Sequence, residues 1–517
     1  MQARKTVLPA VRAIVAAAVL SLLLACARLP PRGEVPVATA PPPATTGAIA
    51  ARVLEAEQAH PGQSGFRLVD SGAEAYAARM YSARYAARSL DIQTYIWHAD
   101  MTGMLLARHA LEAADRGVEV RILVDDMDAR AKNAALAALD AHPRIQVRLY
   151  NPLASRSGSV RKVGELATRF RRLNHRMHNK SWIADNRLAL VGGRNLGDEY
   201  FQAHGTSNFV DLDLLMVGPV VREASANFDR FWNSPSNYPI SQLQAEAAPA
   251  QALERLRGKL DEAARRLPAS PYAAVLRDDP GVRAIIDDST RLHWTADWTF
   301  ASDDPLKAMQ PVETRSQVLA VLRPAFEAAQ SSAHLISPYF VPGEGGTRLL
   351  ADSRARGVDV RVLTNSLAAT DVAAVHGGYA RYRPALLSGE VLLWELKPVA
   401  GRSGNFSIAG SSGSSLHTKA AVFDTRQVFV GSYNLDPRST SLNSEQGVLV
   451  THPALAQELG ALFAREVEGG RAWRVTQDGD GLRWSDGTRT WTREPEAGAA
   501  RRVQAWLAKF LPVESQL

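Results

Sequence analysis

The sequence predicts an α/β protein in which one layered domain occurs twice. Residues 116–123 read RGVEVRIL, and residues 356–363, about 240 positions later, read RGVDVRVL. Each block follows an apolar strand-like run, and each run follows a segment whose apolar residues recur at helical spacing. The order helix, strand, strand, found twice in one chain, indicates two copies of a layered α/β domain.

Length and composition agree with this interpretation. The 517 residues suffice for two domains of ordinary size. A hydrophobic content of 46% is typical of a folded protein and excludes a long disordered half. The net charge of +7 favours contact with polyanions, either nucleic acid or an anionic lipid surface, and does not choose between them.

The first residues predict export and lipid attachment. Arg4, Lys5 and Arg12 precede an apolar run over 13–24 that is too short to span a bilayer, which indicates a signal peptide over residues 1–25. The run ends in LLAC, which resembles the lipobox of bacterial lipoproteins, with Cys26 as the lipidated residue. Cys26 is the only cysteine, so no disulfide is expected. We expect a membrane-anchored protein of the cell envelope that faces away from the cytoplasm, with inner or outer membrane left open.

The remaining segments follow in order along the chain. A Pro/Ala-rich stretch over 26–60 lacks periodicity and is expected to be an extended tether. In the first domain, helical spacing over 74–89 precedes the strand pattern LDIQTYIW over 90–97, and in the second domain helical spacing over 316–331 precedes HLISPYFV over 334–341. The predicted boundaries are 61–235 for the first domain, 236–300 for an Arg/Glu-rich helical connector, 301–470 for the second domain and 471–517 for a C-terminal extension.

Each domain carries the same short motif at identical spacing. Both copies contain a histidine, a lysine, an aspartate and an asparagine: His178, Lys180, Asp185 and Asn195, then His417, Lys419, Asp424 and Asn434. Residues i and i+2 of a strand point to one face, so the histidine and lysine of each copy are expected to lie side by side. The aspartate begins a turn, and the returning strand brings the asparagine back to the same edge.

This set of side chains, present twice, suits a phosphodiester. Lysine and asparagine donors can hold the negative charge that develops on the phosphoryl oxygens. One histidine can attack phosphorus while the other protonates the departing oxygen, so that a phosphohistidine divides the displacement into two steps. No metal or cofactor is expected, because the chain offers no clustered set of cysteines or histidines.

Two further acidic residues are candidates for orienting the histidines. Aligning the strands that follow the motifs, DLLMVGPVV from 213 and GVLVTHPAL from 447, places Asp211 opposite Glu445. A nucleophilic imidazole needs an acceptor on its other ring nitrogen, and these carboxylates are predicted to supply it. Asp185 and Asp424 are expected mainly to brace their turns, with direct participation in catalysis as the alternative.

The paired motifs resemble the HxKxxxxD signatures of the phospholipase D superfamily, including its trailing G-x-x-N elements, from about residue 60 to the end. The resemblance implies two α/β/α sandwich domains packed as a pseudo-twofold pair with one shared active site. It also implies His178 as the nucleophile and His417 as the acid, although the symmetry of the motifs permits the reverse.

Several shorter stretches are similar to class C bacterial cardiolipin synthases: GGRNLGDEYF at 192–201, DLD at 211–213, DDP at 303–305, the Gly/Ser loop at 410–415 and LPVESQL at 511–517. This similarity implies transfer of a phosphatidyl group from a phospholipid such as phosphatidylglycerol, with phosphatidylethanolamine as a second candidate substrate, to make cardiolipin. Hydrolysis to phosphatidic acid would use the same intermediate, and the motifs do not separate the two outcomes. A lipid anchor disfavours a nuclease that binds nucleic acid, and two complete motifs disfavour an inactive scaffold.

Overall fold

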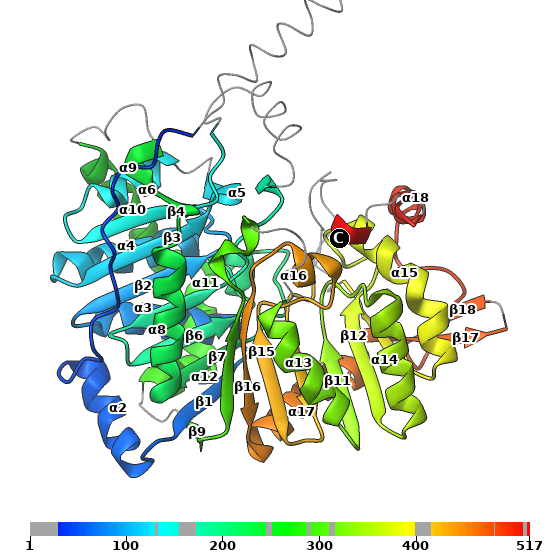
Figure 1. The fold of residues 1–517 in the computed structure, drawn as a ribbon. Helices are drawn as coiled ribbons and strands as arrows, with labels where there is room; N and C mark the ends of the chain where they lie inside the picture. Colours follow the sequence, from blue (N-terminus) through cyan, green and yellow to red (C-terminus); the bar gives the residue numbers. More distant parts are fainter. Residues whose placement is uncertain are drawn as a thin grey trace, which may run out of the picture.

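The structure is a computed structural model, and it describes residues 29–129, 133–154, 172–243, 251–286, 291–309, 316–398, 415–479, 481–509 and 514–516. Within these residues the chain forms two mixed β-sheets, each with helices on both faces (Figure 1). The predicted duplication of an α/β domain is confirmed. The signal peptide, Cys26 and residues 410–414 of the Gly/Ser loop lie outside the described residues.

The first sheet contains the strands of the first half. Its strands are β1 (Ser64–Val69), β2 (Ser89–Thr94), β3 (Glu119–Asp125), β4 (Ile145–Tyr150), β5 (Ser181–Ala184), β6 (Leu188–Gly192), β7 (Asp213–Val217), β8 (Asn237–Pro239) and β9 (His293–Thr295). They lie in the order β8-β4-β3-β2-β5-β6-β7-β1-β9. β2, β3 and β4 are parallel, whereas β5, β6, β7 and β1 pair antiparallel.

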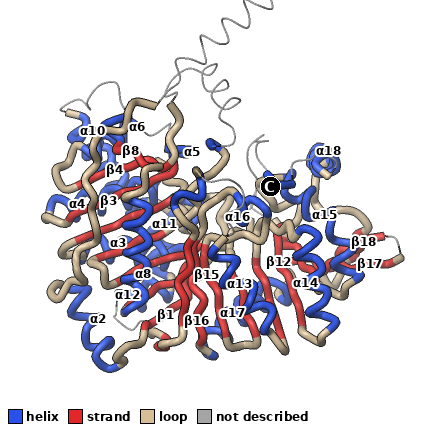
Figure 2. The backbone as a smooth tube through the Cα atoms, viewed as in Figure 1, coloured by secondary structure: helices blue, strands red, loops and turns tan. Residues whose placement is uncertain are grey.

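The second sheet repeats this arrangement. Its strands are β10 (Trp298–Ser302), β11 (Ser332–Ile336), β12 (Asp359–Asn365), β13 (Leu392–Leu396), β14 (Ala420–Phe423), β15 (Gln427–Gly431), β16 (Gln446–Thr451), β17 (Ala472–Asp478), β18 (Gly481–Ser485) and β19 (Thr490–Trp491). The order is β10-β16-β15-β14-β11-β12-β13-β17-β18-β19. The run β13-β12-β11-β14-β15-β16-β10 of this sheet therefore matches the run β4-β3-β2-β5-β6-β7-β1 of the first sheet. Beyond β13, strands β17, β18 and β19 extend the second sheet at its far edge (Figure 2).

The helices form layers outside and between the two sheets. The helices of these layers are α3 (Gly72–Tyr85), α4 (Met101–Asp115), α6 (Asn133–Asp140), α8 (Pro219–Trp232), α13 (Gln317–Ala328), α14 (Gly343–Ala355), α15 (Ala373–Ser388) and α17 (Pro453–Glu468). α3, α4 and α6 cover the outer face of the first sheet, and α13, α14 and α15 cover that of the second. α8 and α17 pack between the sheets in one core that draws on both halves, so the two halves form a single unit.

Other helices lie at the ends of strands and in the connections. They are α5 (Asp126–Ala129), α9 (Ile240–Leu243), α10 (Ala252–Arg266), α11 (Pro271–Asp278), α12 (Pro280–Ile286), α16 (Pro437–Ser441), α18 (Ala499–Ala508) and the 3₁₀ turns η2 (Asp198–Tyr200), η3 (Leu267–Ala269), η4 (Pro305–Ala308) and η5 (Glu514–Gln516). In the expected connector, α10 and α12 pack on α4 and α3, and β9 joins the first sheet. No helix among the described residues is long and apolar enough to cross a membrane.

The segment before the first domain differs from the expected free tether. Ala48–Ala59 form a helix, α2, with Ile49 and Val53 buried. Ahead of it, the backbone docks on the first domain: the amides of Ala38 and Ala40 donate to Asn233 Oδ1 at 3.1 Å and Asp229 Oδ2 at 2.8 Å. Periodicity cannot reveal such docking, because backbone atoms rather than apolar side chains make the contacts.

Candidate active site

The histidines lie where the two halves meet, each at the start of a strand. His178 precedes β5 and His417 precedes β14, and both side chains are buried. The backbone amide of His178 donates to the Ser444 carbonyl at 2.9 Å, and that of His417 donates to the Val210 carbonyl at 2.8 Å. Each histidine segment is thus held by the half of the chain to which it does not belong.

The carboxylates pair with the histidines crosswise. Nδ1 of His178 lies 2.9 Å from Glu445 Oε2, and Nδ1 of His417 lies 2.6 Å from Asp211 Oδ2. An acceptor at Nδ1 selects the tautomer that leaves Nε2 available for chemistry. The structure therefore brings the four residues together, and the orienting carboxylate of each histidine comes from the opposite half.

Glu445 is held by hydroxyl groups. Ser432 Oγ donates to it at 2.5 Å and Ser439 Oγ at 2.9 Å. Behind it, the Glu445 amide donates to Asp303 Oδ2 at 3.2 Å, and that oxygen also accepts from Lys307 at 2.8 Å. Burial raises the pKa of Glu445 to about 7, and the nearby Lys180 charge only partly opposes this shift.

Asp211 has a different environment. Burial alone would raise the pKa of Asp211, but the charge and hydrogen bond of His417 and the charge of Lys419 lower it below its ordinary value. A Cβ atom at Gly193 would lie 2.1 Å from Asp211 Oδ1, so only glycine leaves room for this carboxylate. The equivalent position in the second half is Ser432, whose hydroxyl instead donates to Glu445.

These surroundings make the two imidazoles unequal. Burial, followed by the charges of Lys180 and Lys419, lowers the pKa of His178 well below its ordinary value. Burial and Lys419 also lower the pKa of His417, but the Asp211 carboxylate opposes that shift. His178 therefore strongly favours the neutral form, while His417 holds a proton more readily.

The lysines and asparagines line the same site. Lys180 Nζ donates to the His178 carbonyl at 2.6 Å, and Lys419 Nζ makes the equivalent bond to the His417 carbonyl. Burial lowers the pKa of Lys419 to about 8 and that of Lys180 well below its ordinary value. Asn195 donates to Tyr200 Oη at 2.9 Å, whereas Asn434 Oδ1 is buried without a hydrogen-bond partner among the described residues.

Two contributors were not predicted from the sequence. The Tyr200 ring lies 5.3 Å from the His417 ring in a T-shaped contact, and Ser439 supports Glu445. Each follows the asparagine of its own motif by five residues, so extending the repeat by five positions would have found both. The ring of Tyr95 forms a T-shaped contact with the His178 ring at 5.3 Å.

The motif aspartates do not reach the histidines. Asp185 and Asp424 follow β5 and β14, at the strand ends opposite to the histidines, in turns where they adopt φ values of 57° and 52°. Asp185 accepts from the amides of residues 87, 88 and 89, and Asp424 accepts from those of 330, 331 and 332. The structure thus gives them a bracing role and places neither as a direct participant in catalysis.

Asp185→Ala is expected to lower the free energy of unfolding by about 2–4 kcal/mol, because three backbone amides lose the fully buried carboxylate that accepts from them. Asp424→Ala is the matched control, since its turn is partly exposed and water can replace the carboxylate. Thermal unfolding measures the difference, and activity per folded molecule should stay near that of the unaltered protein in both variants. A large loss of activity in folded Asp185→Ala would contradict the bracing role.

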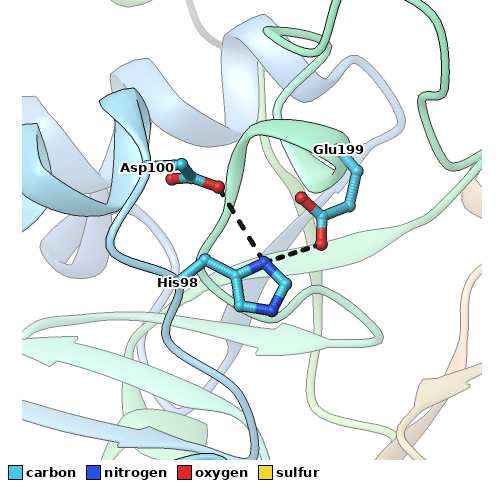
Figure 3. A group of neighbouring side chains, drawn as sticks. All are labelled: His98, Asp100 and Glu199. Carbon is cyan, nitrogen blue, oxygen red and sulfur yellow. Dashed lines mark ion pairs between the residues drawn. The ribbon is translucent and has the colours of Figure 1, made fainter. Parts of the chain in front are cut away.

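A second polar group consists of His98, Asp100 and Glu199 (Figure 3), and Glu199 directly precedes Tyr200, whose ring contacts His417. His98 Nδ1 lies 2.9 Å from Glu199 Oε1 and 3.9 Å from Asp100 Oδ2, close enough for the three to share a cation. Asp100 also caps α4 through the Gly103 amide and accepts from the Asp198 amide. The three side chains thus form an ion-paired cluster. This cluster holds η2, which contains Tyr200, against the start of α4.

Comparisons with known proteins agree with this geometry. The family model described as "Cardiolipin synthase, PLD-like domain" matches residues 78–232 and 322–467. The chain is 38% identical to cardiolipin synthase C of Escherichia coli K12 over 90% of its own length and 99% of that protein, and 25% identical to cardiolipin synthase B of the same strain over 74% and 76%. The crystal structure of phosphatidylserine synthase from Haemophilus influenzae covers 90% of the chain and 98% of that protein with a TM-score of 0.56 at 13% identity, a likeness of fold.

Proposed function

This chain belongs to the cardiolipin synthase family with phospholipase D-like domains, and from that membership we propose that it is a phosphatidyltransferase that makes cardiolipin through a phosphohistidine. The observation that carries the proposal is the crosswise pairing of His178 with Glu445 and of His417 with Asp211. It supplies one neutral imidazole and one imidazole suited to hold a proton, as a two-step displacement requires.

In the first step, His178 Nε2 attacks the phosphorus of the donor lipid. An N–P bond forms as the bond from phosphorus to the leaving alcohol oxygen breaks, and His417 gives that oxygen its proton. Lys180, Lys419 and the Asn434 amide face the charge on the phosphoryl oxygens. The unequal pKa values of the two histidines favour this assignment over the reverse one.

In the second step, the hydroxyl of an acceptor lipid attacks the phosphohistidine. His417, now neutral, takes the hydroxyl proton, and the N–P bond breaks to restore His178. With phosphatidylglycerol as donor and acceptor, the products are cardiolipin and glycerol.

Purified protein incubated with labelled phosphatidylglycerol, with and without phosphatidylethanolamine, tests the proposal. A product with four acyl chains, absent with His178→Ala, is the expected result. Phosphatidic acid as the sole product would identify water as the acceptor and reject the synthase proposal.

The dependence on pH follows from Glu445, His417 and Lys419. Activity expressed as kcat/KM is expected to rise through about pH 7, as Glu445 loses its proton and becomes the acceptor for His178. The need for a proton on His417, whose pKa lies below its ordinary value, makes activity fall on the alkaline side of the optimum, and Lys419 adds to the fall above about pH 8, as it loses the charge that faces the phosphate. Glu445→Gln cannot titrate, so a rising limb that persists unchanged in this variant would contradict the assignment.

We also propose that the protein is a lipoprotein held at a membrane through Cys26. The docked N-terminal segment (dark blue) begins beside α9 and α6, on the upper side of the view that also carries α18 (Figure 1). There α18 exposes Val503, Trp506 and Leu507 to 55%, 57% and 50% while Ala505 and Ala508 are buried, a pattern that suits contact with lipid. Cys26→Ser should lose labelling by radioactive palmitate in cells, and unchanged labelling would refute the anchor.

A further inference from the structure

The second half contains a cavity of ≈ 480 Å³. Helices α13 and α14 form its two side walls, and strands β11, β14 and β15 form its floor. The segment 433–441, which includes α16, closes one end. The size and the apolar walls, made mainly of leucine, phenylalanine and alanine, are typical of a small-molecule binding site.

One residue on the floor of this cavity differs in size from its counterpart in the first half. Trp182 stands four residues after His178, and Ala421 stands four residues after His417. The Trp182 side chain is 1% exposed and its Nε1 donates to Ser82 of α3 at 2.9 Å, so the indole fills the gap between sheet and helix. Ala421 leaves the corresponding volume empty and lines the cavity.

The cavity lies next to the active site. Tyr433 and Leu435, the neighbours of Asn434, both line it, and Ala420 and Ala421 follow Lys419 directly. The cavity also reaches the surface, because the lining residue Arg323 has a side chain that is 64% exposed. One backbone segment therefore separates the phosphate-binding side chains from an open apolar space.

Polar groups at the closed end are satisfied within the protein. Asp436 accepts from the Ser439 amide at 2.6 Å, and Tyr433 Oη lies 2.7 Å from Thr440 Oγ1. A ligand in this space would therefore gain mainly from burying hydrocarbon, and an unfilled apolar cavity of this size destabilises a fold. The gain from burying hydrocarbon and the cost of an unfilled cavity both favour a long alkyl chain over a polar ligand.

We infer that this cavity binds an acyl chain of the phospholipid whose phosphate lies at the two histidines. The inference rests on the proposed function and deepens it, because it makes the enzyme selective for long-chain lipids. The chain passes around the segment 433–435 from the phosphate into the space that Ala421 leaves open.

Ala421→Trp tests this inference by placing in the second half the residue that the first half already contains. For dioleoyl phosphatidylglycerol, kcat/KM should fall at least about tenfold, since each buried methylene group favours binding roughly fourfold. For dihexanoyl phosphatidylglycerol, whose chains are too short to fill the cavity, kcat/KM should change less than about twofold. An unchanged ratio between the two lipids, or an equal loss for both, would overturn the inference.

Gly345→Leu is the second variant, in case the tryptophan prevents folding. Gly345 lines the cavity on the exposed first turn of α14, where nothing lies within 4 Å of an added Cβ and leucine favours the helix. Gly345→Leu should also lower the ratio of kcat/KM for dioleoyl phosphatidylglycerol to kcat/KM for dihexanoyl phosphatidylglycerol. An unchanged ratio would count against the inference. If the unaltered protein yields no phospholipid product, the proposed function fails. Binding of pyrene-labelled dioleoyl phosphatidylglycerol then tests the acyl site separately. If the unaltered protein binds this lipid no better than Ala421→Trp does, the acyl site is refuted.

Discussion

His178→Ala is expected to lower the rate of phosphatidyl transfer by at least about 10⁴-fold, the largest effect of any single substitution in this chain. The reason is that the variant loses the atom that bonds to phosphorus, and among the described residues the site holds no other imidazole but His417. Burial and two lysine charges keep His178 neutral, which makes its Nε2 a ready nucleophile. The measurement is the initial rate of cardiolipin formation, with circular dichroism to verify folding.

His417→Ala is the matched control, because it separates the nucleophile from the acid. A phosphatidyl ester of p-nitrophenol needs no proton on its leaving group, so His417→Ala should still release p-nitrophenolate once per molecule and accumulate an acid-labile phosphohistidine. His178→Ala should give neither. Covalent label on His417 in the His178→Ala variant would reverse the two roles.

The duplicated fold could be predicted because similar segments occur in both halves of the sequence. RGVEVRIL and RGVDVRVL mark β3 and β12, and the motifs mark β5 and β14, so the matched strands take the same places in both sheets. The turns at Asp185 and Asp424 could also be predicted, because a turn with positive φ selects such residues. Sequence patterns thus predict the strands and turns that occur in both halves.

The features that could not be predicted are those that differ between the halves or cross between them. Asp211 and Glu445 were found by aligning strands, but their exchange of partners depends on how the two sheets pack, which no local pattern encodes. The docking of residues 38–40 depends on backbone contacts to α8 and the residue after it. The cavity is lined by a small residue, Ala421, whose size is informative only beside its counterpart in the first half, Trp182.

The differences between the halves serve the chemistry. Position 193 is glycine beside a short aspartate, while its counterpart Ser432 donates to the longer Glu445. The pKa of Asp211 is lowered and that of Glu445 is raised to about 7, so two similar histidines receive dissimilar partners. A symmetrical pair of domains thereby yields an asymmetrical pair of catalytic groups, as a reaction with distinct attacking and leaving groups requires.

Asp211→Asn is expected to lower kcat for phosphatidyl transfer by about 10³ to 10⁴-fold, although Asp211 belongs to the first half and acts on a histidine of the second. The carboxylate stabilises the protonated form of His417 and accepts from its Nδ1 at 2.6 Å. An amide can donate to Nδ1 instead, which selects the wrong tautomer and removes the negative charge.

The loss should depend on the leaving group, because the defect lies in proton donation. With phosphatidyl-p-nitrophenol, Asp211→Asn should recover most of the rate of the first step, measured as the burst of p-nitrophenolate. Glu445→Gln is the matched substitution on the other histidine, and its burst should stay slow with either leaving group, since it impairs the nucleophile. An equal recovery in both variants would show that the carboxylates do not act on separate histidines, and the crosswise assignment of acid and nucleophile would then fail.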